Sequence, residues 1–308
     1  MDVLCYGVLC VDQIVRVAAT YPEPDGHARI LEEGEYVGGE AANSALALAR
    51  LGVSVRLKGN VIGTDRRGRL FMEQLRGEME SAETSLQLGI DVENGVETPH
   101  AIIMASADGH RTILGSFAAL RSHPLSEADL DGVKLLSVDP FLGLQASSAA
   151  YLAKAQGLSV CSIEIHPGNE MAQWCDVIIN SEGWMQRHGW DTPETIGIAL
   201  LRQGVHTVVF TRGVKGCLVM DQEQGVFEHS AFEVNVVDST GAGDAFRAGF
   251  IYGMLRHWEL RRTVRFASAE AALNCRGLGG WPHAPDRGMV EALLSAEKEK
   301  VEIKAKVK

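Results

Sequence analysis

Short runs rich in valine, isoleucine and leucine alternate with longer helical segments along most of the 308-residue chain. The runs that read as strands are residues 2–9, 53–62, 133–139, 158–166, 175–181 and 206–213. Helical patterns separate most of them, such as the small-residue segment 38–52 and the amphipathic segment 65–78. Strands that alternate with helices predict a parallel sheet covered on both faces. We therefore expect a three-layer α/β/α fold with a predominantly parallel central sheet.

Two segments depart from this alternation and predict a second, smaller sheet. Residues 13–37 alternate apolar and polar side chains around a "PEPDG" turn, and residues 98–116 read as a hairpin with "ADGH" as its turn. We expect a β-sheet lid from about 12–37 and 92–116, inserted in a single domain that spans 1–308. The alternative is a pair of surface hairpins without a function.

Composition excludes several classes of protein. A net charge of −11 is wrong for binding the nucleic-acid backbone, which requires a basic surface. The six cysteines form no C-x-x-C pair and the ten histidines show no H-E-x-x-H spacing, so neither predicts a metal site. No apolar stretch of about 18 residues and no signal peptide are evident, which predicts no membrane partner and a reduced cytoplasmic compartment.

The stretch "VVDSTGAGDAFRAGF" (236–250) contains the most informative turn. Residues 232–238 read as a strand or strand end. A helix face follows, marked by the i, i+4, i+8 spacing of Phe246, Phe250 and Met254. Residues 239–243 ("STGAG", here called the glycine turn) therefore connect a strand to a helix. The first N–H groups of a helix have no internal partners, and small side chains leave them open to an anion. The glycine turn is thus a candidate phosphate cradle.

Asp244 falls in the first turn of this helix and has two interpretations. It can cap free N–H groups and favour the helix dipole, as many aspartates do. It can also take a proton from a hydroxyl that attacks a phosphoryl group held at the turn, because phosphoryl transfer requires positioning, charge stabilisation and one base.

The motif "DSTGAGDAF" resembles the D-[ST]-T-G-A-G-D signature of the ribokinase-like, or PfkB, family of carbohydrate kinases. "GGEAANSALALARLG", "VIGTDRRGRLFMEQL" and "TRGVKG" are similar to further motifs of that family and occur in its order. The resemblance covers nearly the whole chain. It implies a kinase that uses ATP and Mg²⁺ and, in some members, K⁺.

The resemblance also implies roles for individual residues of the acceptor site. Asp244 matches the catalytic base. The anion hole for the transferred phosphoryl group is matched by Gly241, Ala242 and Gly243. The sugar-binding positions are matched by Asp12, Gly38, Gly39 and Asn43. Arg111 matches a lid arginine that binds phosphate or substrate, although a solvated hairpin arginine is the competing interpretation.

On the nucleotide side, Thr211, Gly213 and Gly216 match the nucleotide loop, Asn180 matches the N-x-x-E asparagine, and Asn274 matches an adenine contact. Asp238 and Thr240 match a monovalent-cation site.

The N-x-x-E motif itself is altered. Gly183 replaces the glutamate that organises Mg²⁺ through water, and Glu182 stands one residue early. Either Glu182 acts from a shifted loop or Mg²⁺ is held differently.

Substrate choice is less constrained. The lid segments look most like ketohexokinase and fructose-type kinases, and Glu40 beside the sugar site disfavours an anionic substrate unless Arg29 or Arg111 offsets it. We therefore expect phosphorylation of a primary hydroxyl of a small neutral sugar, a ketohexose such as fructose or ribose. Arg247 is interpreted as a solvent-facing helix residue without a role.

Two alternatives stay open. A nucleoside kinase needs an apolar slot for the base, and the candidates for its lining are Tyr21, Tyr36, Ile102 and Met104. More remote is a non-catalytic ligand sensor on the same fold. Because relatives often pair through their lids, the resemblance also implies a homodimer.

Overall fold

The computed structural model describes residues 1–18, 21–80, 85–106, 110–117 and 120–306. Its nine-stranded sheet has the order β15-β14-β13-β12-β11-β10-β1-β4-β6. These strands are β15 (Gly225–His229), β14 (Cys217–Asp221), β13 (Thr207–Thr211), β12 (Val177–Ser181), β11 (Ser159–Ile163), β10 (Leu135–Val138), β1 (Val3–Gly7), β4 (Ser54–Gly59) and β6 (Ser85–Leu88). All neighbours from β6 to β13 pair in parallel, and β14 and β15 form an antiparallel edge. The prediction of a predominantly parallel sheet is confirmed.

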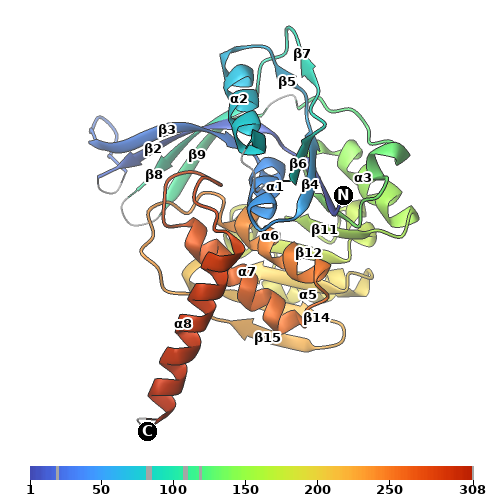
Figure 1. Ribbon diagram of the computed structural model, residues 1–308, viewed down its shortest axis with the longest axis vertical. Coiled ribbons are helices and arrows are strands. Elements are labelled where there is room, and N and C mark those ends of the chain that lie inside the picture. The colour runs from blue at the N-terminus through green and yellow to red at the C-terminus, as the bar shows by residue number, and fades with distance from the viewer. Residues whose placement is uncertain (19–20, 81–84, 107–109, 118–119, 307–308) are drawn as a thin grey trace.

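Helices cover both faces of this sheet, as predicted (Figure 1). One face carries α1 (Glu40–Arg50), α2 (Arg66–Glu80), α6 (Ala242–Leu255), α7 (Leu260–Asn274) and part of α8 (Arg287–Lys306). The other face carries α3 (Leu144–Ala155), α4 (Glu182–Arg187) and α5 (Pro193–Arg202). In β1, Val3 and Cys5 pack on the first face while Leu4 and Tyr6 pack on the second, as expected for a strand buried on both sides.

A separate four-stranded sheet, here called the lid, has the order β3-β2-β8-β9. Its strands are β2 (Cys10–Val17), β3 (Ile30–Gly38), β8 (His100–Ala105) and β9 (Arg111–Ser116). The lid projects from one side of the molecule (Figure 1). The two predicted lid segments therefore form one sheet. At 92, however, the predicted boundary falls on β7 (Val92–Glu93), which pairs with β5 (Ile62–Gly63) outside the lid. Residues 107–109 of the predicted "ADGH" turn lie outside the described residues.

The predicted strand at 232–238 is wrong. Residues 231–238 form an irregular segment that leads into the glycine turn. The Val237 and Asp238 N–H groups both donate to the carbonyl of Cys275, at 2.8 and 3.3 Å. Two donors on one carbonyl make a loop contact and not a strand ladder. The antiparallel strands β14 and β15, which are absent from the sequence expectations, supply the sheet edge instead.

The carboxyl ends of the parallel strands bring the predicted site residues to one edge of the sheet. The chain leaves β1 for the lid strand β2, while β10, β11, β12 and β13 end next to Asp139, Glu164, Ser181 and Thr211. Two short 3-10 turns follow directly at this edge, η2 (Pro140–Leu142) after β10 and η4 (Gly213–Lys215) after β13, whereas η1 (Glu127–Leu130) and η3 (Glu170–Trp174) precede β10 and β12. Ligands of open α/β sheets bind at such an edge.

Candidate active site

The glycine turn ends at the start of α6. Gly241 is the N-cap of α6 with φ of 72°, and a side chain there would overlap with the backbone of Gly280. Only glycine fits this left-handed position against another backbone. Gly243, in the first turn, is exposed, and a Cβ on it would meet no atom within 4 Å. The Ala242 N–H donates to the Ser239 carbonyl at 3.3 Å, while the first turn of α6 is open on the side of Gly243, and an anion requires such an open helix start.

Asp244 follows this opening, and donors hold both of its oxygens. The Asn43 amide donates to Oδ2 at 3.0 Å, and the Arg247 guanidinium lies 3.4 Å from Oδ1. The side chain is 13% exposed. The pKa of Asp244 is raised to about 7, mainly by burial and also by the charge of Glu40, against the opposing effects of Arg247, Asn43 and Arg111. A carboxylate of this kind accepts a proton efficiently near neutral pH.

The predicted sugar-binding residues meet at the start of α1. Asp12, in lid strand β2, is 5% exposed, and Gly38 lies so close that a side chain there would overlap with its carboxylate. Gly39 is the N-cap of α1. Asn43 lies one turn further along, where its N–H donates to the Gly39 carbonyl at 2.9 Å. Burial raises the pKa of Asp12 to about 7, partly offset by a hydrogen bond from the Cys10 thiol at 3.3 Å.

The two carboxylates are contacted by residues on either side of the start of α1. Gly38, the last residue of β3, lies beside Asp12, and Asn43, in the first turn of α1, donates to Asp244. Asn43 Oδ1 is buried and has no hydrogen-bond partner within the described part of the chain.

Arg111 connects the lid to the glycine turn. Its guanidinium donates to the backbone carbonyl of Ser239 at 2.6 Å. The side chain is exposed on a hairpin strand, as in the competing interpretation, and it also contacts the glycine turn. This contact places a positive charge of the lid beside the predicted anion hole.

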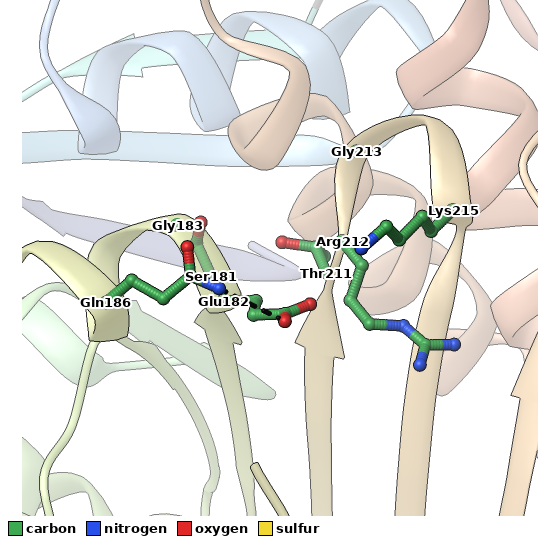
Figure 2. Close-up of a pocket in the computed structure, with 8 residues that line it drawn as sticks. All are labelled: Ser181, Glu182, Gly183, Gln186, Thr211, Arg212, Gly213 and Lys215. Atoms are coloured by element: carbon green, nitrogen blue, oxygen red, sulfur yellow. Dashed lines mark hydrogen bonds between the residues drawn. The ribbon is translucent and has the colours of Figure 1, made fainter. Parts of the chain in front are cut away.

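A cavity of about 290 Å³ lies between the start of α4 and the loop from β13 to β14 (Figure 2). Thr211 and Gly213 line it, as does Glu182, whose side chain extends toward Thr211. Lys215 and Arg212 supply positive charge on the loop side, and Arg212 is paired with Glu228 at 2.9 Å. Two of the three residues of the predicted nucleotide loop, Thr211 and Gly213, therefore line this cavity.

Three predicted ligand contacts are instead tied to the backbone. Asn180 is fully buried, and its amide exchanges two hydrogen bonds with the backbone of Ile165, at 2.9 and 3.0 Å. Gly216 packs against the backbone of β15, where a side chain would overlap with the His229 carbonyl. Asn274 is also fully buried and donates to the Thr240 and Gly280 carbonyls, both at 3.2 Å. Asn180 and Asn274 have no exposed surface with which to contact a nucleotide in this state.

The predicted cation residues sit beneath the glycine turn. Asp238 accepts hydrogen bonds from the Thr240 N–H and hydroxyl, at 2.9 and 2.8 Å, and from the Gly279 N–H at 3.0 Å. Together with Asn274, Asp238 thus ties the segment at Gly279 and Gly280 to the turn.

A family model described as "pfkB family carbohydrate kinase" matches residues 1–158 and 178–286. The chain belongs to the PfkB family of carbohydrate kinases. It is 27% identical to the nucleoside kinase of Methanothermobacter thermautotrophicus over 96% of both chains. It is 29% identical to the ATP-dependent ribose-1-phosphate kinase of Halopiger xanaduensis over 89% of this chain and 92% of that protein.

Among solved structures, the chain is similar to Arabidopsis thaliana ribokinase complexed with ribose and ATP, with a TM-score of 0.76 and 25% identity over 95% of this chain and 98% of that one. This PfkB protein is therefore a phosphotransferase with an alcohol acceptor, acting on a sugar or a nucleoside, and its family uses ATP.

Three charged residues near this site were not predicted from the sequence to belong to it. Asp139 and Glu164 follow β10 and β11, and their place directly after buried strands was the available signal. Glu164 has φ of 50°, accepts from the Ser181 N–H at 3.2 Å, and has a pKa that burial raises to about 8. Arg247 is 1% exposed, so its interpretation as a solvent-facing residue is wrong. Helix α6 packs against both α1 and α7, which buries that side.

No group of three or more metal-ligating side chains occurs among the residues that the structure describes. A Mg²⁺ ion that arrives on ATP phosphates keeps several waters and needs only one or two protein carboxylates. Glu164 and Glu182 are the two carboxylates at the ends of β11 and β12. In the same described ranges, no helix is long and apolar enough to span a bilayer.

Proposed function

We propose that this protein transfers the γ-phosphoryl group of ATP to a primary hydroxyl of a small neutral sugar, either a ketohexose or ribose. One observation carries the proposal. A largely buried Asp244 stands at the start of α6, and the junction of β3 and α1 connects it to Asp12, because Gly38 lies beside Asp12 and Asn43 donates to Asp244. Asp12 and Asn43 bind the sugar hydroxyls, Asp244 takes the proton of the attacking hydroxyl, and the N–H groups of residues 241–243 bind the phosphoryl oxygens.

Charge around the acceptor site favours a neutral substrate. Glu40, in the first turn of α1, raises the pKa values of Asp12, Asp139 and Asp244 alike. An anionic group brought among these carboxylates would be repelled, and the exposed Arg111 is the lid cation that opposes this effect at Asp12. This argument separates the protein from its relative named as a ribose-1-phosphate kinase. A ketohexose is favoured by the resemblance of the lid segments to those of fructose-type kinases in sequence.

A nucleoside kinase is the second candidate, because a relative that matches 96% of the chain is named as one. The predicted base slot needs revision. Tyr36 pairs with Asp12 across the lid and packs with Ile14, Ala101 and Ile103, whereas Ile102 alternates to the other face. Met104 lies on the same face as Ile102. The apolar inner face is therefore built by Tyr36 and its neighbours, without Ile102 and Met104.

A substrate panel tests the proposal. Hexoses, pentoses and nucleosides are assayed for ADP release, each with and without K⁺, and Asp244→Asn is the control for chemistry. We expect turnover of a neutral sugar and a loss of about 10²–10⁴-fold in Asp244→Asn. Turnover of nucleosides alone would refute the sugar assignment, and binding without any turnover would favour the sensor.

For the metal, we propose that Glu164 replaces the missing motif glutamate. Its two carboxylate oxygens accept from the Ser181 N–H at the end of β12, at 3.2 and 3.3 Å, and besides burial the charges of Glu40 and Asp244 raise its pKa. Because burial holds its pKa at about 8, Mg²⁺ binding would release a proton. Glu182, which lines the nucleotide cavity and accepts from Gln186 at 3.3 Å, is the competing carboxylate. When bound, Mg²⁺ neutralises charge on the phosphates.

K⁺ binding beside the glycine turn is a further part of the proposal, supported by the meeting of Asp238, Thr240 and Gly279. We also propose a homodimer through the lid. Ile102 and Leu114 are neighbours on its outer face and are 40% and 60% exposed. A cytoplasmic location fits six buried cysteines that are all unpaired.

A further inference from the structure

Arg247 is the largest fully buried side chain in the part of the protein that the structure describes. An arginine is almost never buried unless its charge is paired, because the loss of hydration is costly. It belongs to the first two turns of α6, three residues after Asp244. Its presence inside the molecule therefore requires a specific set of partners.

Those partners come from α1 and from the proposed base. Arg247 Nε donates to the Ser44 hydroxyl at 2.9 Å, and Nη2 donates to the Glu40 backbone carbonyl. The same Nη2 lies 3.4 Å from Asp244 Oδ1. Ser44 in turn donates to the Asp244 backbone carbonyl at 3.3 Å. Two neutral oxygens thus fix the guanidinium between the helices, and its charge is directed at Asp244.

Asn43, which precedes Ser44 in α1, completes the set of donors around Asp244. Its amide holds Oδ2 of Asp244 while Arg247 holds Oδ1. The carboxylate is therefore fixed in both orientation and rotamer by two donors on two different helices. A lysine could not reach these acceptors together, because the planar guanidinium has several donors and an ammonium is a single point.

Charged groups of both signs act on Asp244 from the elements around it. Glu40 on α1 raises the pKa of Asp244, and Arg247 on α6 and Arg111 on β9 lower it. The other titratable groups coupled to Asp244 or to Arg247 are Glu164 after β11, Asp139 after β10, Cys5 on β1, Cys10 on β2 and Cys161 on β11. Among these groups, Arg247 is the buried cation, and it faces three carboxyl groups.

We propose that Arg247 is a positioning residue that keeps the Asp244 carboxylate ionised and aimed at the acceptor hydroxyl against the opposing charge of Glu40. The inference rests on the proposed role of Asp244 as the base. Arg247 and Glu40 act on Asp244 with opposite charges, and the balance between them sets the pH range in which the kinase works.

The pH dependence of kcat and KM tests this role. In Arg247→Met, the acid limb of the kcat/KM profile should move to higher pH by about one pH unit or more, since an opposite charge at this range has been removed. Turnover at pH 7 should fall about tenfold and recover largely at pH 9. The midpoint of the acid limb in Arg247→Lys should lie between those of the wild-type protein and Arg247→Met. Glu40→Gln should move the limb to lower pH. Ser44→Ala, which removes a neutral partner but no charge, should leave its midpoint in place.

A double-substitution cycle covers the case in which Arg247→Met does not fold. Arg247→Met/Glu40→Gln removes one charge of each sign, and its midpoint should lie above that of Glu40→Gln alone. A parallel loss of kcat at every pH, with an unmoved midpoint, would show a purely structural role and overturn the proposal. If Asp244→Asn keeps its turnover, the base assignment itself fails. If Asp244→Asn is inactive and the midpoint of Arg247→Met is unmoved, only the role of Arg247 fails.

Discussion

Replacement of Gly243 by alanine should separate stability from activity in this protein. Gly243 lies in the first turn of α6, is exposed, and has no atom within 4 Å of the position that a Cβ would take. A methyl group there meets no neighbouring protein atom, but under the proposed function it occupies the space of the phosphoryl group. The fold should tolerate the change and the chemistry should not.

The expected magnitudes follow from this geometry. Alanine is better than glycine in a helix by about 0.5–1 kcal/mol, so the free energy of unfolding should stay the same or rise by up to that amount. That corresponds to a rise in Tm of roughly 2 °C or less. A displacement of about 1 Å in the reacting groups can cost on the order of 10² in rate. We therefore expect kcat to fall by on the order of 10–10² while the protein remains fully folded.

Two matched glycines provide controls. Gly77 in α2 also has no atom near a Cβ, and Gly77→Ala should give the same small gain in stability with unchanged kcat. Gly241→Ala should lose both stability and activity. Its φ of 72° costs a side chain about 1–2 kcal/mol, and a Cβ there would overlap with the backbone of Gly280. Thermal unfolding and steady-state kinetics on the same preparations give both quantities.

Normal turnover in Gly243→Ala would refute the assignment of this helix start as the anion site. A loss of stability in Gly243→Ala as large as that in Gly241→Ala would refute the open space on which the argument depends.

Three further results are expected. The kcat/KM of the wild-type protein should rise with pH through a midpoint near 7, because burial raises the pKa of Asp244 to about 7 and only its ionised form accepts a proton; a flat profile from pH 5.5 to 8.5 would contradict this. Glu164→Gln should raise the Mg²⁺ concentration for half-maximal activity about 10-fold or more, and a Mg²⁺ titration in which only Glu182→Gln has that effect would return the metal role to the α4 loop. Glu270 is fully buried without a hydrogen-bond partner among the described residues, and burial raises its pKa well above the usual range. Glu270→Met should therefore raise the free energy of unfolding by about 1–3 kcal/mol at pH 8. Below the unfolded pKa of about 4.3 the carboxyl is neutral in both states and costs no ionisation energy, whereas the cost of keeping it neutral in the fold grows as pH rises toward the folded pKa. The gain in the free energy of unfolding, measured by urea unfolding, should thus be smaller at pH 5 than at pH 8. A larger gain at pH 5 would contradict this prediction.

The sequence predicted those features of this protein that depend on a few neighbouring residues. The strand and helix alternation predicted the parallel sheet because side-chain periodicity reflects which faces are buried. The glycine turn and the position of Asp244 could be predicted from the sequence for a similar reason. A left-handed glycine and the free N–H groups of a helix start are properties of a few consecutive residues.

Several residues could be placed only by packing between distant segments. Asn180 and Asn274 carry the amides expected of ligand contacts, yet the folded chain uses both to bridge backbone groups. The apolar run at 232–238 has the pattern of a strand, but the sheet already ends at β15 and the run pairs with the carbonyl of Cys275. Neither outcome is encoded in the neighbouring residues.

Arg247 shows the same division within a single helix. From the sequence, the residue after "DAF" on an amphipathic helix has the pattern of a solvated arginine. In the structure, α1 and α7 enclose α6 on both sides, and Ser44, Glu40 and Asp244 surround the guanidinium. Exposure depends on which helices pack against a face, and here the partner Ser44 lies 203 positions away in the chain. The glycine turn, our proposed phosphoryl site, was thus determined locally, whereas the burial of Arg247 beside Asp244 was decided by the tertiary fold.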